Sequence, residues 1–133
     1  MSTPIKAGRK SLRGASVLVV EDDSEVLDMT AIVLERAGAR VTRTVSAEDA
    51  LQALSREQFS CAVIDWNLGS SNADRIIATV RAEQSALAER TVIVTGDFLS
   101  RGDEASARRY GFRVMAKPFP PRRLVETLAD FLS

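Results

Sequence analysis

The stretch that decides the fold is Cys61-Ala62-Val63-Ile64-Asp65. Its first four residues are apolar and partly β-branched, a pattern typical of a strand that is buried on both faces of a parallel sheet. The stretch then stops at a single carboxylate. Open α/β sheets place their chemistry at the carboxyl ends of their strands, so Asp65 is the first candidate for a functional residue.

Three other short apolar runs also end at polar side chains. They are Val17–Val20 before Glu21-Asp22-Asp23, Thr91–Val94 before Thr95, and Val114–Ala116 before Lys117-Pro118. As parallel neighbours, these strands would bring several carboxylates, one hydroxyl and one ammonium together at one edge of the sheet. Such a set of groups indicates a phosphoryl-transfer site.

The segments between the strands carry helix signals. Ser24 is a good N-cap for a first helix that Gly38 ends, and Ser46 begins a capping-box-like start to a second. An edge strand is expected over residues 39–44, a loop over 67–72, and further helices over about 73–83, around 105–110 and after Pro121. Five strand–helix alternations predict a flavodoxin-like, doubly wound five-stranded parallel sheet, order 2-1-3-4-5, with helices on both faces.

Composition limits the class of protein. A chain of 133 residues suits one domain, and its 18 Lys+Arg balance 18 Asp+Glu, which disfavours binding to nucleic acid or an anionic membrane. No apolar run approaches the roughly 20 residues of a membrane span, and the N-terminus lacks a signal peptide's apolar core. The single cysteine, Cys61, is expected to be a buried hydrophobe in a reducing cytoplasm. With no histidine, any metal must be one that prefers oxygen ligands.

Residues 1–16 form a separate region of the sequence. They contain four basic residues, no acid and no hydrophobic periodicity. We therefore expect a mobile basic N-terminal tail over 1–16 and a folded domain over 17–132.

The acids at the strand ends suggest a metal ion. Any one of them could be a solvated loop residue or a helix N-terminal charge. Two carboxylates ~4 Å apart, however, repel by about 4 kcal/mol at an effective dielectric constant of 20, so a cluster of three calls for a cation. Oxygen ligands with room for a phosphate favour Mg²⁺. Without that ion, Glu21, Asp22 and Asp65 are expected to face one another with no cation between them.

Four motifs together resemble a known family. They are Val17-Leu18-Val19-Val20-Glu21-Asp22, Val63-Ile64-Asp65-Trp66, Val94-Thr95-Gly96 and Ala116-Lys117-Pro118-Phe119. In this order and spacing they are similar to the receiver domain of two-component response regulators, over roughly residues 17–132. The resemblance implies a single-domain regulator or a receiver from a larger regulator or hybrid kinase.

The resemblance also implies roles for individual residues. Asp65 would be the phosphoacceptor, and Glu21, Asp22, Asp65 and the backbone carbonyl of Asn67 would hold Mg²⁺. Thr95 would bond a phosphoryl oxygen, with the small Gly96 leaving access. Lys117 would pair with the phosphate, and the peptide bond between Lys117 and Pro118 is often cis in this family.

Such a domain is a phosphorelay switch rather than an enzyme, although it assists its own phosphorylation and dephosphorylation. Its expected partners are a sensor histidine kinase or a histidine phosphotransfer protein, and a downstream protein target. Neither nucleic acid nor membrane is expected as a partner of the domain. A weak or phosphorylation-dependent dimer is also compatible with the resemblance.

Three positions depart from the family pattern, and two alternative functions stay open. Gly69 stands where a proline is usual, Ala73 replaces a glycine, and Val114 replaces a reporter aromatic. These changes leave room for a degenerate receiver that docks partners without phosphorylation. An Mg²⁺-dependent aspartyl-phosphate phosphohydrolase is the second alternative, but its D-x-D motif would fall on Glu21-Asp22-Asp23, which does not fit at the nucleophile.

Overall fold

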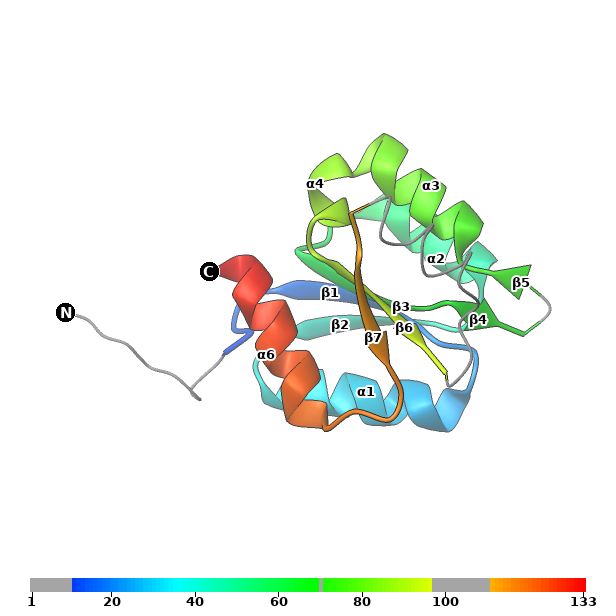
Figure 1. The fold of residues 1–133 in the computed structure, drawn as a ribbon. Coiled ribbons are helices and arrows are strands. Elements are labelled where there is room, and N and C mark those ends of the chain that lie inside the picture. Colours follow the sequence, from blue (N-terminus) through cyan, green and yellow to red (C-terminus); the bar gives the residue numbers. More distant parts are fainter. Residues whose placement is uncertain (1–10, 70, 97–110) are drawn as a thin grey trace.

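A computed structural model of the chain describes residues 11–69, 71–96 and 111–133. Figure 1 shows one parallel sheet between two layers of helices. The elements in chain order are β1 (Ser16–Val20), α1 (Ser24–Arg36), β2 (Arg40–Thr44), α2 (Ala47–Arg56), β3 (Cys61–Asp65), β4 (Asn67–Leu68), β5 (Ser71–Asn72), α3 (Asp74–Glu83), α4 (Ser85–Ala88), β6 (Thr91–Thr95), β7 (Arg113–Ala116) and α6 (Pro121–Leu132).

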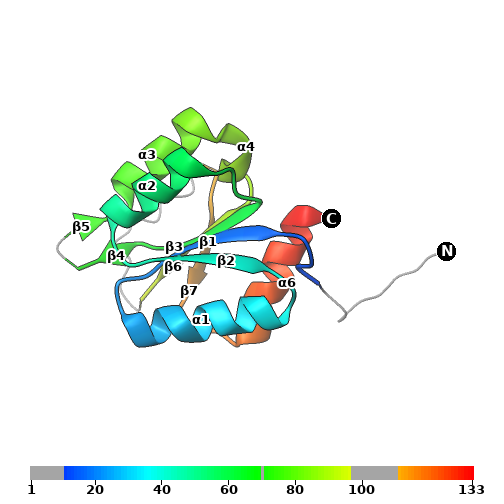
Figure 2. The ribbon, with the colours of Figure 1, turned by 180° about the vertical axis from the view of Figure 1, so that it is seen from behind.

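The predicted sheet topology is confirmed. The order β2-β1-β3-β6-β7 is the expected 2-1-3-4-5 once the two short strands of a separate pair, β4 and β5, are left out of the count. All four strand pairs of the main sheet are parallel. Helices α1 and α6 cover one face, while α2, α3 and α4 cover the other, as the two opposite views show (Figures 1 and 2).

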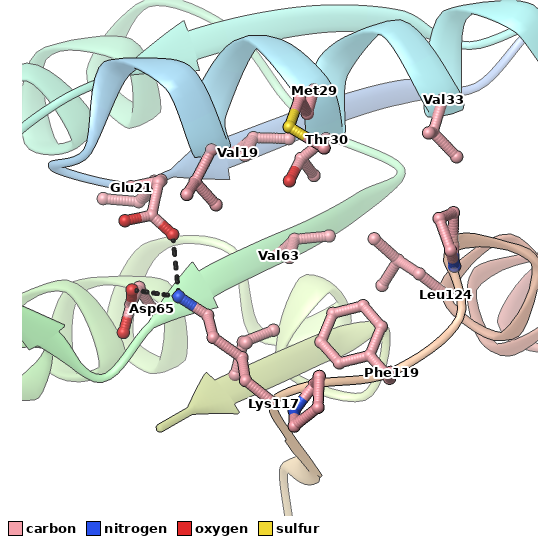
Figure 3. A pocket seen from close by; sticks show the side chains of 15 residues that line it. Val19, Glu21, Met29, Thr30, Val33, Val63, Asp65, Lys117, Phe119 and Leu124 are labelled. Atoms are coloured by element: carbon pink, nitrogen blue, oxygen red, sulfur yellow. Dashed lines mark hydrogen bonds and ion pairs between the residues drawn. The ribbon is translucent and has the colours of Figure 1, made fainter. Parts of the chain in front are cut away.

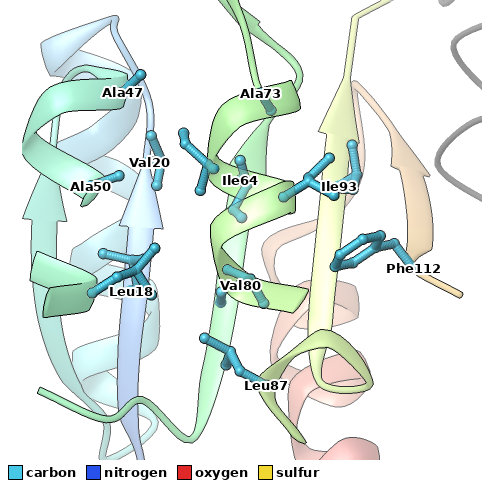
Figure 4. Close-up of a cluster of buried hydrophobic side chains, with 14 of the residues drawn as sticks. Leu18, Val20, Ala47, Ala50, Ile64, Ala73, Val80, Leu87, Ile93 and Phe112 are labelled. Atoms are coloured by element: carbon cyan, nitrogen blue, oxygen red, sulfur yellow. The ribbon is translucent and has the colours of Figure 1, made fainter. Parts of the chain in front are cut away.

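The strand β3 explains why the central runs of the sequence are apolar without alternation. Ile64 packs under α3 (Figure 4), and Ala62 belongs to the same cluster with residues of α2 and α3, whereas Cys61 and Val63 pack with residues of α1 and α6. Every residue of β3 is buried, because both faces of the sheet are covered by helices. Burying a side chain such as that of Ile64 contributes about 1.5–3 kcal/mol. The strand that carries Asp65 at its end is therefore buried along its whole length.

The N-cap of α1 is Asp23, so the prediction of Ser24 as the cap was wrong. Asp23 Oδ1 accepts hydrogen bonds from the backbone N–H of Glu25 (3.0 Å) and Val26 (3.2 Å), and Ser24 is the first helical residue. A carboxylate fulfils the same capping role as a hydroxyl and also interacts favourably with the positive end of the helix dipole. Asp23 is thus a helix cap.

The packed part of the chain begins before Val17, which corrects the predicted boundary of the tail. Leu12 is fully buried, and its N–H donates to the carbonyl of Ala37 (2.8 Å) beyond the end of α1. Ala15 is also buried, and its N–H donates to the carbonyl of Leu12. A single turn of chain is therefore anchored on the α1–β2 junction. Residues 1–10 lie outside the described part of the chain.

Three short elements, β4, β5 and α4, were not predicted. The expected loop after Asp65 contains an antiparallel pair, with Leu68 of β4 opposite Ser71 of β5. Helix α4 follows α3 directly at Gln84, whose buried side-chain amide accepts from the N–H of Phe59 and donates to the carbonyls of Leu54 and Glu57. The helix predicted around 105–110 lies outside the described residues. Among the helices that are described, none combines the length and the apolar composition that crossing a membrane requires.

Candidate functional site

Four of the predicted site residues lie at the carboxyl ends of neighbouring strands. Asp65 and Thr95 are the last residues of β3 and β6, Glu21 follows β1 directly, and Lys117 follows β7. The register aligns these ends, because Val20 pairs with Ile64 and Thr95 pairs with Ala116. The predicted convergence on one edge of the sheet is confirmed (Figure 3).

Lys117 lies between two of the acids. Its Nζ donates to Asp65 Oδ2 at 3.0 Å and to Glu21 Oε1 at 3.1 Å, as the dashed lines of Figure 3 show. The expectation that no cation would lie between the acids is therefore wrong. A four-carbon side chain that starts at the end of the edge strand β7 is long enough to reach the central strand and to serve as an internal counter-ion.

The three acids are close enough to share a cation. Glu21, Asp22 and Asp65 each offer one carboxylate oxygen within 4.8 Å of the others, the only such group among the described residues. Glu21 and Asp65 are buried, whereas Asp22 is exposed. Carboxylate oxygens partly open to water are the ligands that Mg²⁺ prefers, so this donor set fits the ion.

Backbone hydrogen bonds hold the two buried carboxylates in position. Glu21 Oε2 accepts from the N–H of Asp23 (3.1 Å), and Asp65 Oδ1 accepts from the N–H of Asn67 (3.0 Å). Each acid thus bonds the backbone through one oxygen and Lys117 through the other. Both carboxylates are fixed before any ligand binds, which lowers the cost of assembling a binding site.

Burial and mutual interaction shift the pKa values of Glu21 and Lys117. Burial is the largest cause that raises the pKa of Glu21, and the nearby charge of Asp65 adds to it; the bonds from Asp23 and Lys117 offset only part of the rise. Burial by itself would lower the pKa of Lys117, but the hydrogen bonds and charges of Asp65 and Glu21 raise it overall. The Lys117 side chain is therefore held in its ammonium form.

Thr95, at the end of the strand next to β3, and Asn67, two residues after Asp65, have hydrogen-bond partners of their own. The Thr95 side chain is buried, and its hydroxyl donates to the carbonyl of Gly96 (3.2 Å). Asn67 begins β4, and its N–H holds Asp65. The peptide bond between Lys117 and Pro118 is cis, as the resemblance implied.

Gly69 lies next to Asp22, a contact that could not be predicted from the sequence. Its backbone has φ +72°, a left-handed conformation, and a Cβ added there would lie 3.3 Å from Asp22 Oδ2. A proline cannot adopt this φ. Gly69 therefore allows the chain to turn from β4 toward β5 directly over one of the three acids. The signal in the sequence was a glycine in a turn-rich segment close behind Asp65, but nothing in it pointed to Asp22.

Comparison with known proteins agrees with this geometry. The family model of the response regulator receiver domain matches residues 17–129. The transcriptional regulatory protein GltR of Pseudomonas aeruginosa is 29% identical over 127 residues, covering 92% of this chain and 50% of GltR. The sensory/regulatory protein RpfC of Xanthomonas campestris is 26% identical over 135 residues, covering 97% of this chain and 18% of RpfC. The chain thus spans at most half the length of these relatives.

A solved structure supports the same assignment. The CheY-like response regulator receiver domain protein from Methanospirillum hungatei has a TM-score of 0.82 and 25% sequence identity, with coverage of 89% of this chain and 93% of that chain.

The five-stranded parallel sheet, with three acids and a lysine gathered at one edge, has the features of a receiver domain. The chain belongs to the response regulator receiver domain family. Members of this family act in two-component signalling, with histidine kinases and downstream targets as their partners.

Proposed function

We propose that this domain accepts a phosphoryl group on Asp65 from the phosphohistidine of a sensor kinase or of a histidine phosphotransfer protein. The observation that carries the proposal is the position of Asp65: a fixed carboxylate at the end of the central strand, within 4.8 Å of Glu21 and Asp22 and bonded to Lys117. A nucleophile, a site for a divalent cation and a neutralising ammonium are thus brought together.

The chemical step follows from these contacts. A carboxylate oxygen of Asp65 attacks the phosphorus, the P–N bond to the donor histidine breaks, and its electron pair stays on the imidazole. Mg²⁺, when held by Glu21, Asp22, Asp65 and the Asn67 carbonyl, would neutralise charge on the phosphoryl oxygens.

Two side chains change partners in the proposed step. Lys117 exchanges its contact with Asp65 for a phosphoryl oxygen, which keeps a positive charge beside the new anion. The Thr95 hydroxyl turns from the Gly96 carbonyl to a second phosphoryl oxygen. These exchanges of partners would transmit the phosphorylated state to the loops at this edge.

The proposed output is a change in binding to a protein target. The 18 basic and 18 acidic residues give no net positive charge that would draw this domain to nucleic acid. A reducing cytoplasm is the proposed location, because the one cysteine, Cys61, is buried and unpaired by any disulfide.

Neither alternative function has an observation of its own in its favour. A phosphohydrolase of the D-x-D type would need Asp23 at the site, but Asp23 caps α1. A docking module without phosphorylation would use Lys117 only as a counter-ion for Glu21 and Asp65, and it would have no use for three acids close enough to share a further cation.

Intact mass spectrometry tests the proposal. The wild type is incubated with acetyl phosphate and Mg²⁺, and it should gain one phosphoryl group. Asp65→Asn should gain none, whereas Asp23→Asn is the matched control and should gain one, because it changes an acid at the same edge that serves only as a helix cap. Stoichiometric labelling of Asp65→Asn would overturn the assignment.

A further inference from the structure

A cavity of about 280 Å³ lies beneath the acid cluster, between α1, the face of the sheet and the segment that leads into α6. Figure 3 shows Met29 and Val33 of α1 on one side, Val63 of β3 behind, and Phe119 and Leu124 on the other side. Nothing in the proposed phosphoryl transfer uses this cavity. It is nevertheless continuous with the site, since Glu21, Asp65 and Lys117 form part of its lining.

The size of the cavity limits the class of occupant. An apolar cavity of about 150 Å³ in a protein can hold benzene. The present cavity is larger, so it can hold one aromatic ring with a short chain attached. Met29 at its rim is 67% exposed, and a flexible thioether side chain can adapt to ligands of different shape.

The chemistry of the lining limits the class further. Apart from Thr30 and the charged residues at one end, the walls are aliphatic, aromatic or proline side chains. At the charged end, the carboxylates of Glu21 and Asp65 outnumber the single ammonium of Lys117, and Asp22 adds a further negative charge close by. An anionic head group would be repelled there, whereas a cationic head group would be attracted.

We propose that this cavity binds a small amphipathic amine, an aromatic ring or short hydrocarbon that carries an ammonium group on a flexible chain. The apolar part lies between α1 and α6, and the ammonium donates to the carboxylates of Glu21 and Asp65. An occupant placed in this way competes with Lys117 and with Mg²⁺ for the same oxygens. If Asp65 is the phosphoacceptor, as proposed above, the occupant also slows its phosphorylation.

Three probes of one size separate the parts of the proposal: 3-phenylpropylamine, 3-phenylpropan-1-ol and 3-phenylpropanoate. Binding to the wild type is followed by calorimetry and by two-dimensional NMR of the valine and leucine methyl groups. The amine should bind with a Kd of about millimolar or tighter. It should bind at least about tenfold more tightly than the alcohol, and the acid should not bind measurably. Equal binding of all three probes would contradict the proposal that Glu21 and Asp65 select a cationic head group.

Adjacent residues of α1 provide a matched pair of variants. Val33→Trp fills the cavity, while Ile32→Trp introduces the same side chain at a neighbouring position that is 43% exposed and not part of the lining. Amine binding should be lost in the first variant and kept in the second. If Val33→Trp does not fold, competition on the wild type decides instead, because added Mg²⁺ should weaken amine binding several-fold. Binding that Mg²⁺ does not affect would place the amine elsewhere.

The same samples distinguish failure of this inference from failure of the proposed function. Labelling of Asp65 by acetyl phosphate is measured first without amine and then with saturating amine. Normal labelling with no amine binding would overturn only the cavity proposal. If the protein bound the amine but took up no phosphoryl group, the proposed function would be overturned and the cavity proposal would stand. Binding together with undiminished labelling would show that the ammonium does not reach Asp65.

Discussion

Lys117 Nζ lies 3.0 Å from Asp65 Oδ2, although the two residues are 52 positions apart in the sequence. The same ammonium lies 3.1 Å from Glu21 Oε1. Lys117 is 33% exposed, and both carboxylates are buried, so this is a partly desolvated network rather than a surface ion pair. Lys117 was expected to bind a phosphate, but without one it already binds the carboxylates of Glu21 and Asp65 and neutralises part of their charge.

Removal of Lys117 should therefore change stability as well as signalling. Lys117→Met leaves two neighbouring buried carboxylates without their cation, and we expect a loss of about 1–3 kcal/mol in the free energy of unfolding without added Mg²⁺. Mg²⁺ should stabilise the variant more than the wild type, because the ion replaces the missing charge. Denaturant unfolding with and without Mg²⁺ measures both effects.

A control for Lys117→Met is Arg75→Ala. Arg75 pairs with Glu48 at 3.3 Å where both side chains are largely exposed, so its loss should cost less than about 1 kcal/mol and should not depend on Mg²⁺. Equal, Mg²⁺-independent losses in the two variants would mean that Lys117 is not the counter-ion of the site.

Gly69 should matter for metal binding. Gly69→Ala places a methyl group 3.3 Å from Asp22 Oδ2 and strains a backbone with φ +72°. We expect the Kd for Mg²⁺ to rise several-fold, measured by calorimetry. Gly111→Ala is the matched control, because Gly111 has φ +85° and no atom of the described residues lies within 4 Å of its added Cβ. It should lose similar stability and keep the wild-type Kd. If the Kd for Mg²⁺ changed equally in both variants, the contact between position 69 and Asp22 would not be the cause of the weaker binding.

The thiol of Cys61 should make the protein sensitive to alkaline pH. Burial raises its pKa from the ordinary 9.0 to about 11. Between these values the folded protein holds a proton that the unfolded chain has lost, so stability falls as the pH rises through this window. A shift of this size corresponds to about 2–3 kcal/mol. Unfolding curves at pH 8 and pH 11 should show that Cys61→Val, which has no thiol to ionise, loses correspondingly less than the wild type. If the wild type and Cys61→Val lost equal stability between pH 8 and pH 11, burial would not raise the pKa of the Cys61 thiol.

Asp23 should matter for stability and not for chemistry. Asp23→Ala removes the acceptor for the N–H groups of Glu25 and Val26, and we expect a loss of about 1 kcal/mol. Asp23→Asn should restore most of it. Thermal unfolding measures the cost, and labelling by acetyl phosphate should persist in both variants. Loss of labelling in a folded Asp23→Asn would place this acid in the site.

The sheet and the position of the acids could be predicted from the sequence because their signals are local. A strand covered on both faces, such as β3, is a continuous apolar run, and the rules of parallel crossovers then bring Asp65, Glu21 and Lys117 to one edge. Long amphipathic helices such as α1 were predictable for the same reason.

What could not be predicted depends on contacts between distant segments. Leu12 is a single apolar residue in a polar stretch, and only the surface at the end of α1 makes it part of the core. The approach of Gly69 to Asp22 and the bridge made by Lys117 depend on the paths of a loop and a long side chain. Neither of these two contacts produces a periodic pattern of apolar residues in the sequence. Asp23 rather than its neighbour Ser24 is the N-cap of α1. Asp and Ser are both good N-cap residues, so the sequence alone did not decide between these adjacent positions.

The central claim is that Asp65, and no other acid of the cluster, receives the phosphoryl group. Borohydride reduction converts an aspartyl phosphate into homoserine, which peptide mass spectrometry locates in the chain. After treatment with acetyl phosphate and Mg²⁺, homoserine should appear at position 65 and nowhere else. Homoserine at position 22 or 23, or labelled protein with unmodified Asp65, would contradict the account.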